Sequence, residues 1–250
     1  MGVEMTPMER KLDVGGTLTK IFQTYGDQAG VLLPVAFGLY LLVGIVSALL
    51  AGSLILLPLT LAVTVVAATL YQGMVVGLVK DVQDGRRDYS VGELIEATWP
   101  VVLPLIGAGL LAGLGIGFGF LLLVVPGLFL LTIWAVIAPA IVVEHCGVIE
   151  AFGRSRELVR GNGWQVFGVL FVVFVIAGVV SAILGAIGVA IVSGVGGRIL
   201  GNVIAQTLTA PIGALAAATI YFALVPSDGG PEAPPAAPGP PPPDQPAIPG

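Results

Sequence analysis

The 250-residue sequence has few charged side chains, one cysteine and one histidine. Charged residues make up 10% of the chain, against about 25% in soluble domains. Hydrophobic residues make up 56%, and 36 further residues are glycine. A soluble protein of this composition would have too few polar side chains to cover its surface. With a mean hydropathy of +1.03, the scarcity of charge excludes a soluble domain, a coiled coil and a nucleic-acid-binding protein.

The single cysteine and the single histidine also exclude several kinds of site. Cys146 cannot form a disulfide within the chain, and Cys146 with His145 supplies too few ligands for zinc. Glu144 precedes this pair, but neighbours on a helix point about 100° apart, so these three residues are poorly placed to share a proton. The sequence therefore predicts no catalytic residue, no metal site and no cofactor. It predicts instead that Glu144 contacts Arg154 or another basic residue of the following helix.

The apolar residues form long runs. A helix needs about 20 mostly apolar residues to span a bilayer. Lone strands cannot satisfy their backbone in lipid, and these runs lack the alternation of a membrane β-barrel. We therefore predict an all-α polytopic integral membrane protein with six transmembrane helices, at residues 31–51, 54–79, 100–125, 127–143, 166–195 and 199–225.

The basic residues predict the orientation of these helices. The segments before the first span, after the second and after the fourth hold nine of the ten lysines and arginines, and the opposite side holds only Arg198. The positive-inside rule places the basic side in the cytoplasm. We expect a multi-pass protein of the bacterial plasma (inner) membrane with both termini cytoplasmic. Its parts are then an N-terminal segment (1–30), the six-helix domain (31–225) and a tail (226–250).

Each polar cytoplasmic segment has the apolar spacing of a short amphipathic helix. The first is expected at residues 14–25 with Asp13 as its cap, the second from Ser90 with a capping box to Glu93, and the third at residues 147–160. Such helices suit the membrane interface. The sequence therefore predicts a threefold repeat, in which an interfacial helix precedes each hairpin of two spans.

Small residues recur every fourth position in two spans. Such spacing makes a smooth helix face, typical of close helix packing in membranes. Part of the third span also matches a dinucleotide-binding glycine pattern, but that pattern functions only between a strand and a helix. We therefore predict helix-packing faces at Gly109, Gly113 and Gly117 and at Ala182, Ala186 and Ala190.

The length of the fifth span and a proline–glycine pair bear on where the spans bend and turn. Residues 166–195 would form a helix about 45 Å long against a hydrocarbon core of about 30 Å, so this span must tilt, emerge or break, with Gly185 and Gly188 as weak points. The Pro126–Gly127 pair predicts the turn between spans three and four.

The spans carry no ionisable residue at mid-depth, where such residues mark ion or proton pathways. Gln72, Gln206 and Thr209 are polar residues within spans, and hydrogen bonds between helices would explain them. The sequence therefore gives no support to proton-driven transport.

The stretch from Glu144 to Phe167 resembles the bacterial membrane domain found attached to glycerophosphoryl diester phosphodiesterases. In that family a Glu ends a span, an amphipathic helix with an Arg-Ser pair follows, and Gly and Trp precede the next span. Phe152 stands here where the family has Leu, and the likeness extends over residues 12–225. It implies the membrane domain without the catalytic barrel, so no phosphodiesterase activity. The positions it singles out as a structural motif are Glu144, Glu150, Arg154, Ser155, Gly161 and Trp164.

The tail has eleven prolines in its 25 residues and no aromatic side chain. We expect it to be disordered with polyproline II stretches, and either to be inert or to dock on a protein that reads proline motifs.

Three functions remain open from the sequence. The first is a non-enzymatic structural or accessory protein of envelope or lipid processes, acting in the lipid bilayer with a membrane-protein partner or a second copy of itself. The alternative is a small transporter or channel for an apolar or amphipathic solute. A lipid enzyme is the third, and the lack of paired acid and base residues disfavours it.

Overall fold

The computed structural model describes residues 11–50, 54–83, 91–192 and 194–225, and every regular element in these ranges is a helix. Six stretches among them are long and apolar enough to cross a membrane. The predicted all-α polytopic membrane fold is thereby confirmed. The helices are α1 (Val14–Leu50), α2 (Leu57–Gln83), α3 (Val91–Thr98), α4 (Val102–Leu122), α5 (Val124–Ile133), α6 (Ile137–Glu144), α7 (Val148–Val159), α8 (Gly163–Ile191) and α9 (Val195–Leu224), with 3-10 turns at Leu54–Leu56 and Trp99–Val101.

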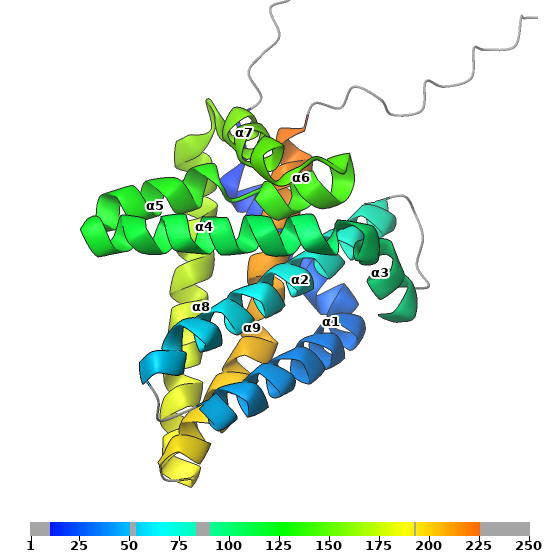
Figure 1. Ribbon diagram of the computed structural model, residues 1–250. Helices are drawn as coiled ribbons and strands as arrows, with labels where there is room; N and C mark the ends of the chain where they lie inside the picture. The colour runs from blue at the N-terminus through cyan, green and yellow to red at the C-terminus, as the bar shows by residue number, and fades with distance from the viewer. Residues whose placement is uncertain (1–10, 51–53, 84–90, 193, 226–250) are drawn as a thin grey trace, which may run out of the picture.

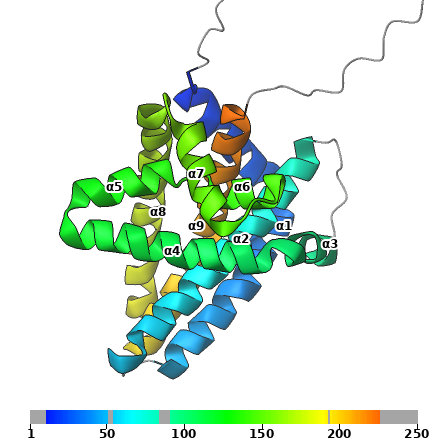
Figure 2. The same cartoon turned by 45° about the horizontal axis from the view of Figure 1, so that its top comes forward.

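Three helical hairpins, α1–α2, α4–α5 and α8–α9, form the body of the described structure, and the short helices α3, α6 and α7 connect them. Helix α9 is its core, because 67% of its most apolar window is buried and it packs along α1, α2 and α8. Figure 1 shows the α4–α5 hairpin lying across α8 rather than alongside it, and the same divergence is seen in Figure 2. The start of α1, helix α7 and the end of α9 lie together, and we call this the polar end of the molecule.

The first predicted interfacial helix is not a separate helix. Residues 14–25 are continuous with the first span in the 37-residue helix α1. Ile21 is fully buried, Leu18 packs against the core, and Tyr25 donates a hydrogen bond to the carbonyl of Leu208 in α9 at 3.2 Å. Protein therefore covers most of the apolar face of this segment, and Phe22 remains exposed. Its predicted cap is confirmed, since Asp13 Oδ1 accepts the backbone N–H of Gly15 at 3.0 Å.

The other two segments form separate helices. Helix α3 precedes α4, but its predicted cap Ser90 lies outside the described residues. Helix α7 presents Ala151, Ser155, Leu158 and Val159 to the protein as buried residues. Helix α7 is thus docked on the bundle. The three segments of the predicted repeat therefore differ in structure, because the first is part of α1 and the other two are separate helices. The tail at residues 226–250 also lies outside the described residues.

The second hairpin turns earlier than predicted. Helix α4 ends at Leu122, the extended residue Leu123 makes the turn, and Pro126 and Gly127 lie in the first turn of α5. Proline is well tolerated in a first turn because the N–H it lacks has no helical partner there. Gly127 packs closely on Gly119, whose added Cβ would lie 2.9 Å from the Gly127 Cα, so the pair brings the two helices together.

The fourth predicted span is broken. Residues 134–136 form a turn between α5 and α6, although the sequence predicted one helix over 127–143. The reason is a change in hydrogen bonding, in which the N–H of Ala135 reaches Thr132 O and the N–H of Ile137 reaches Trp134 O, each at 3.4 Å. Tertiary contacts described below satisfy the groups that this change releases.

The long fifth span is one unbroken helix, α8. Gly185 and Gly188 do not weaken it, and they lie instead at its contact with α9. A Cβ added to Gly188 would lie 2.8 Å from the Cα of Gly201, and one added to Gly201 would lie 2.7 Å from the carbonyl oxygen of Leu184. Backbones this close require glycine on both helices.

The predicted packing faces have different surroundings. In α4, a Cβ on Gly109 would lie 2.9 Å from Thr69 Cβ of α2, and one on Gly113 would lie 3.4 Å from Val65, whereas Gly117 faces open space. In α8, the alanine face does not pack within the chain, because Ala182, Ala186 and Ala190 are all exposed. Helix α8 has two faces of small residues, and α9 covers the glycine face.

Candidate functional site

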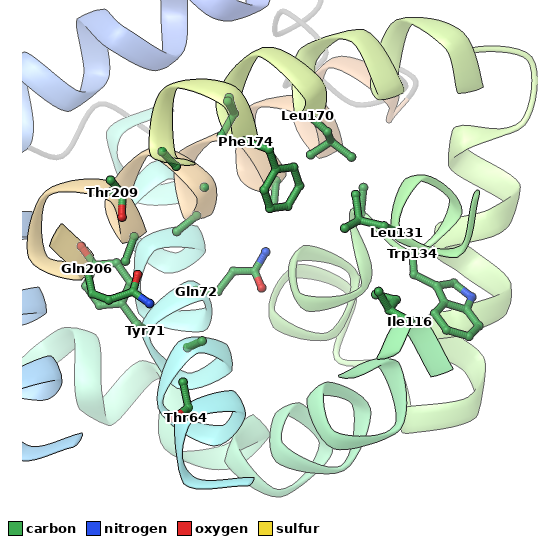
Figure 3. Close-up of a pocket in the computed structure, with 18 of the residues that line it drawn as sticks. Thr64, Tyr71, Gln72, Ile116, Leu131, Trp134, Leu170, Phe174, Gln206 and Thr209 are labelled. Carbon is green, nitrogen blue, oxygen red and sulfur yellow. The ribbon is translucent and has the colours of Figure 1, made fainter. Parts of the chain in front are cut away.

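A cavity of about 400 Å³ lies where the α4–α5 hairpin diverges from α2, α8 and α9. Side chains near the middle of α2, α8 and α9 line it, so it lies at mid-depth along these three helices. Its wall is mostly apolar, with Ile116 of α4, Leu131 of α5 and Leu170 of α8 among its members. Figure 3 shows these side chains surrounding a central opening.

Four polar side chains other than tyrosine line the cavity, Thr64, Gln72, Gln206 and Thr209. Figure 3 shows the amide of Gln72 pointing into the opening, with Gln206 beside Tyr71 on the same side. The hydroxyls of Tyr71 and Thr209 are engaged within the protein, by the carbonyls of Leu32 at 3.0 Å and of Ala205 at 2.8 Å. The amides of Gln72 and Gln206 and the hydroxyl of Tyr40, which also lines the cavity, make no hydrogen bond among the described residues and are free to bond an occupant.

The predicted hydrogen bonds between helices are not made by the glutamines. Gln72 and Gln206 are half-buried, and neither side chain has a hydrogen-bond partner among the described residues. Thr209 bonds only to its own helix. The prediction was wrong because these side chains face the cavity and not a neighbouring helix.

The broken fourth span forms one wall of the cavity. Trp134 and Ala135 of the break line it, together with Leu131. Ser155 of α7 holds the break in place. Its hydroxyl is fully buried, donates to the carbonyl of Ile133 at 2.8 Å and accepts the N–H of Val136 at 3.3 Å. One serine thus satisfies two backbone groups that the break releases, as a buried irregular segment requires.

An ion-pair cluster anchors α7 at the polar end. Arg154 donates through Nε to Glu144 at 2.8 and 3.0 Å, which confirms the predicted contact, and through Nη1 to Glu157 at 3.2 Å. The hydrogen bond to Glu144 is the main cause of the raised pKa of Arg154. Tyr221 of α9 donates to Glu144 at 2.8 Å. Glu150 accepts the N–H of Gly147 at 3.3 Å as a helix cap.

The remaining motif residues lie where α7 joins α8. Gly161 has φ of +89°, a backbone conformation that favours glycine and that ends the helix. Trp164 is 84% exposed, as suits an aromatic side chain at a membrane interface. Between them, the Oδ1 of Asn162 accepts the N–H of Leu12 at 3.0 Å and ties the chain before α1 to this junction.

Cys146 is buried against the polar-end cluster. Burial is the main cause of its raised thiol pKa, and the carboxylates of Glu144 and Glu150 raise it further. Only the thiolate is nucleophilic. We therefore expect maleimide to label folded protein at pH 7.5 much more slowly than unfolded protein, with the rate still rising above pH 9. Equal rates in the two states, measured by intact mass, would show that the thiol is neither buried nor shifted.

Two contributors to this region were not identified from the sequence. Tyr221 reaches Glu144 across 77 residues, and an aromatic residue near the end of a span carries no signal of such a bond. Trp134 packs edge-on against Phe152 of α7 with ring centroids 4.9 Å apart. The sequence around Trp134 is mostly apolar and carries no proline or glycine that would indicate a helix break there.

The described residues define a polytopic membrane protein with a cavity between its hairpins and a broken helix in the cavity wall. The family model described as "Domain of unknown function (DUF7847)" matches residues 12–227, and the chain belongs to this family. Comparison with curated proteins and with solved structures gave no match.

Proposed function

We propose that this protein binds an uncharged amphipathic molecule in the cavity between its hairpins and carries it within the bilayer. The observation that supports this proposal most directly is the pair of half-buried glutamines, Gln72 and Gln206, which face an apolar cavity without a protein partner. Such a molecule would place its apolar part against the cavity wall and a hydroxyl, ester or amide group against the glutamines.

The polar groups and the size of the cavity suit an occupant. Gln72 and Gln206 are half-buried, so a ligand that displaces water from the cavity would keep their amides hydrogen-bonded. At about 400 Å³, the cavity also falls within the range of about 300–1,000 Å³ that is usual for small-molecule sites.

The lining argues for an uncharged ligand. The described side chains around the cavity include no Asp, Glu, Lys, Arg or His. A charge at mid-depth in a membrane is costly unless it is paired. The same lining lacks an acid and base pair, which supports a non-enzymatic role.

The cavity has an opening toward the surroundings of the bundle. Phe174, on its α8 wall, is 54% exposed, so the cavity reaches the surface of the bundle at this side chain. In a membrane this side faces lipid. A ligand would therefore enter from the bilayer, which suits an amphipathic molecule better than a water-soluble one.

The orientation and the family likeness belong to the same proposal. The basic residues support a bacterial plasma membrane protein with cytoplasmic termini, so the polar end would face the cytoplasm. The positions from Glu144 to Trp164 support a relationship with the membrane domain of glycerophosphoryl diester phosphodiesterases, without their enzymatic activity.

A structural or accessory role with a membrane partner is the second candidate. The exposed alanine face of α8 favours it, because small residues allow another helix to approach closely. Crosslinking and pull-down in native membranes, with and without residues 226–250, test this role and the proline-rich tail together.

Photolabelling tests the proposed cavity. The protein in phosphatidylcholine nanodiscs is irradiated with a diacylglycerol that carries a diazirine on one acyl chain, and labelled residues are mapped by mass spectrometry. We expect labels on Leu131, Leu170 and Phe174. Gln72→Leu and Gln206→Leu should each reduce this labelling about tenfold, which corresponds to one lost hydrogen bond to a buried group.

The matched control is Gln165→Leu, which removes a half-buried glutamine of α8 outside the cavity and should leave labelling unchanged. Labels spread evenly over the lipid-facing surface, or unchanged labelling of Gln72→Leu, would contradict the proposal.

A further inference from the structure

A second cavity, of about 350 Å³, lies at the polar end between the start of α1 and the end of α9. It is separate from the mid-depth cavity and shares no lining residue with it. Its lining combines charged, hydroxyl and apolar side chains: Lys11, Leu12, Asp13, Thr17, Lys20, Thr219, Phe222 and Ala223.

Thr219 is the feature of this cavity that points to a ligand. It is only 5% exposed, yet its hydroxyl has no hydrogen-bond partner among the described residues. Other threonines in the helices donate to the carbonyl four residues earlier, as do Thr17, Thr60, Thr64, Thr69, Thr132, Thr207 and Thr209. Because Thr219 lines the cavity, its unused hydroxyl is available to a molecule bound there.

The charges of the cavity favour an anion with one negative charge. Lys11 and Lys20 contribute two positive charges and Asp13 one negative charge, so the described lining carries a net charge of +1. The side chain of Asp13 is held by the N–H of Gly15, and the bond from Leu12 N–H to Asn162 fixes the chain next to Lys11. The lysines therefore project from an anchored backbone.

The apolar lining places this site at the depth of lipid headgroups. Phe222 and Ala223 lie in the last turn of α9, where this membrane-spanning helix ends. Apolar side chains here would meet the upper part of acyl chains, while the lysines would meet phosphates. Basic pockets between helices at this depth suit phospholipid headgroups.

We propose that this cavity binds the phosphodiester of a membrane phospholipid, with the phosphate between Lys11 and Lys20 and the hydroxyl of Thr219 donating to a phosphate oxygen. A phosphodiester carries one negative charge and so neutralises the site. Asp13 would accept a hydroxyl or ammonium group of the headgroup. This site goes beyond the proposed transport cavity, because no contact described above depends on the occupant of that cavity.

Lipid retention measured by native mass spectrometry tests the proposal. The full chain is purified from nanodiscs of phosphatidylcholine with about 10% phosphatidylglycerol, which supplies an anionic headgroup for a basic pocket. We expect retained phosphatidylglycerol on the wild type, a reduction of about tenfold for the double variant Lys11→Gln with Lys20→Gln, and about fivefold for Thr219→Val, which keeps every charge.

Matched control variants distinguish a specific lipid site from general attraction of anionic lipid to basic residues. Lys80→Gln removes a lysine at the end of α2, and Thr207→Val removes a buried hydroxyl of α9, both outside this cavity. Both should retain the lipid as the wild type does. An equal loss with Lys80→Gln, or undiminished retention by both cavity variants, would overturn the site.

Competition with inorganic phosphate distinguishes a phospholipid headgroup from a soluble phosphate as the ligand of this cavity. We expect millimolar phosphate to leave lipid retention unchanged, because it lacks acyl chains for the apolar wall. Displacement of the lipid by inorganic phosphate would overturn the lipid assignment in favour of a soluble phosphate site. Thermal unfolding of every variant, followed by tryptophan fluorescence, identifies any variant that fails to fold, and Thr219→Val still tests the site if the double variant does so.

Discussion

Gly201→Val is expected to prevent folding of the helix bundle. A Cβ at this position would lie 2.7 Å from the carbonyl oxygen of Leu184 and 3.0 Å from the Cα of Gly185, so the new side chain meets backbone that cannot move aside. Overpacking usually costs about 1–3 kcal/mol, and more where backbone must shift. Because α9 is the core helix, separating it from α8 also loosens its contacts with α1 and α2. The measurement is the yield of monodisperse protein by fluorescence-detected size exclusion, with the Tm of whatever folds.

The control for this variant is Gly178→Ala on α8, the helix against which Gly201 of α9 packs. A Cβ at Gly178 would meet nothing within 4 Å, and alanine favours a helix over glycine by about 1 kcal/mol. We expect its Tm to equal or exceed that of the wild type. If Gly201→Val folded with an unchanged Tm, the close approach of α8 and α9 would be refuted.

Ser155→Val is expected to cause the second-largest loss of stability. Valine has a similar size but leaves the carbonyl of Ile133 and the N–H of Val136 without the partner that Ser155 provides. Each buried backbone group left unsatisfied costs about 1–3 kcal/mol, so the free energy of unfolding should fall by about 2–5 kcal/mol. Labelling of Leu131 by the diacylglycerol probe should fall as well, because the wall that carries Trp134 would no longer be held.

Ser181→Val on α8 serves as the comparison, since this half-buried serine has no described role at a helix break. Its Tm should lie close to that of the wild type. A Tm for Ser155→Val equal to that of Ser181→Val would show that the break is stable without α7.

The hydrophobic runs were enough to predict the class of fold, because a run of apolar residues long enough to span a bilayer leaves only a helix open to the backbone. They were not enough to predict where helices join or break. Leu18, Ile21 and Tyr25 have the spacing of an amphipathic helix whether lipid or protein covers them. The break at residues 134–136 depends on Ser155, which is about 20 residues away in the sequence and lies in no pattern that indicates this contact.

The candidate cavity was likewise predictable in part, in its polar residues but not in their contacts. Gln72 and Gln206 attract notice in the sequence as polar residues within apolar spans, and both line the cavity. Whether they bond to a neighbouring helix or face an opening depends on the divergence of α4–α5 from α8, which no local pattern encodes. Glu144 and Arg154 were predictable as a pair, because Glu144 ends one helix and Arg154 lies in the next helix after a short turn. Tyr221 contacts Glu144 only because α9 packs beside them.

The position of α9 in the chain has a consequence for biogenesis. Of the six candidate spans it is the most buried and the least apolar, with a window hydropathy of 1.6, and it is synthesised after α1, α2 and α8. The earlier helices must therefore enter the membrane before their central neighbour exists, with their inner faces still covered by lipid. The contacts of α1, α2 and α8 with α9 form only after α9 is synthesised, so insertion of these helices and packing of the core are separated in time.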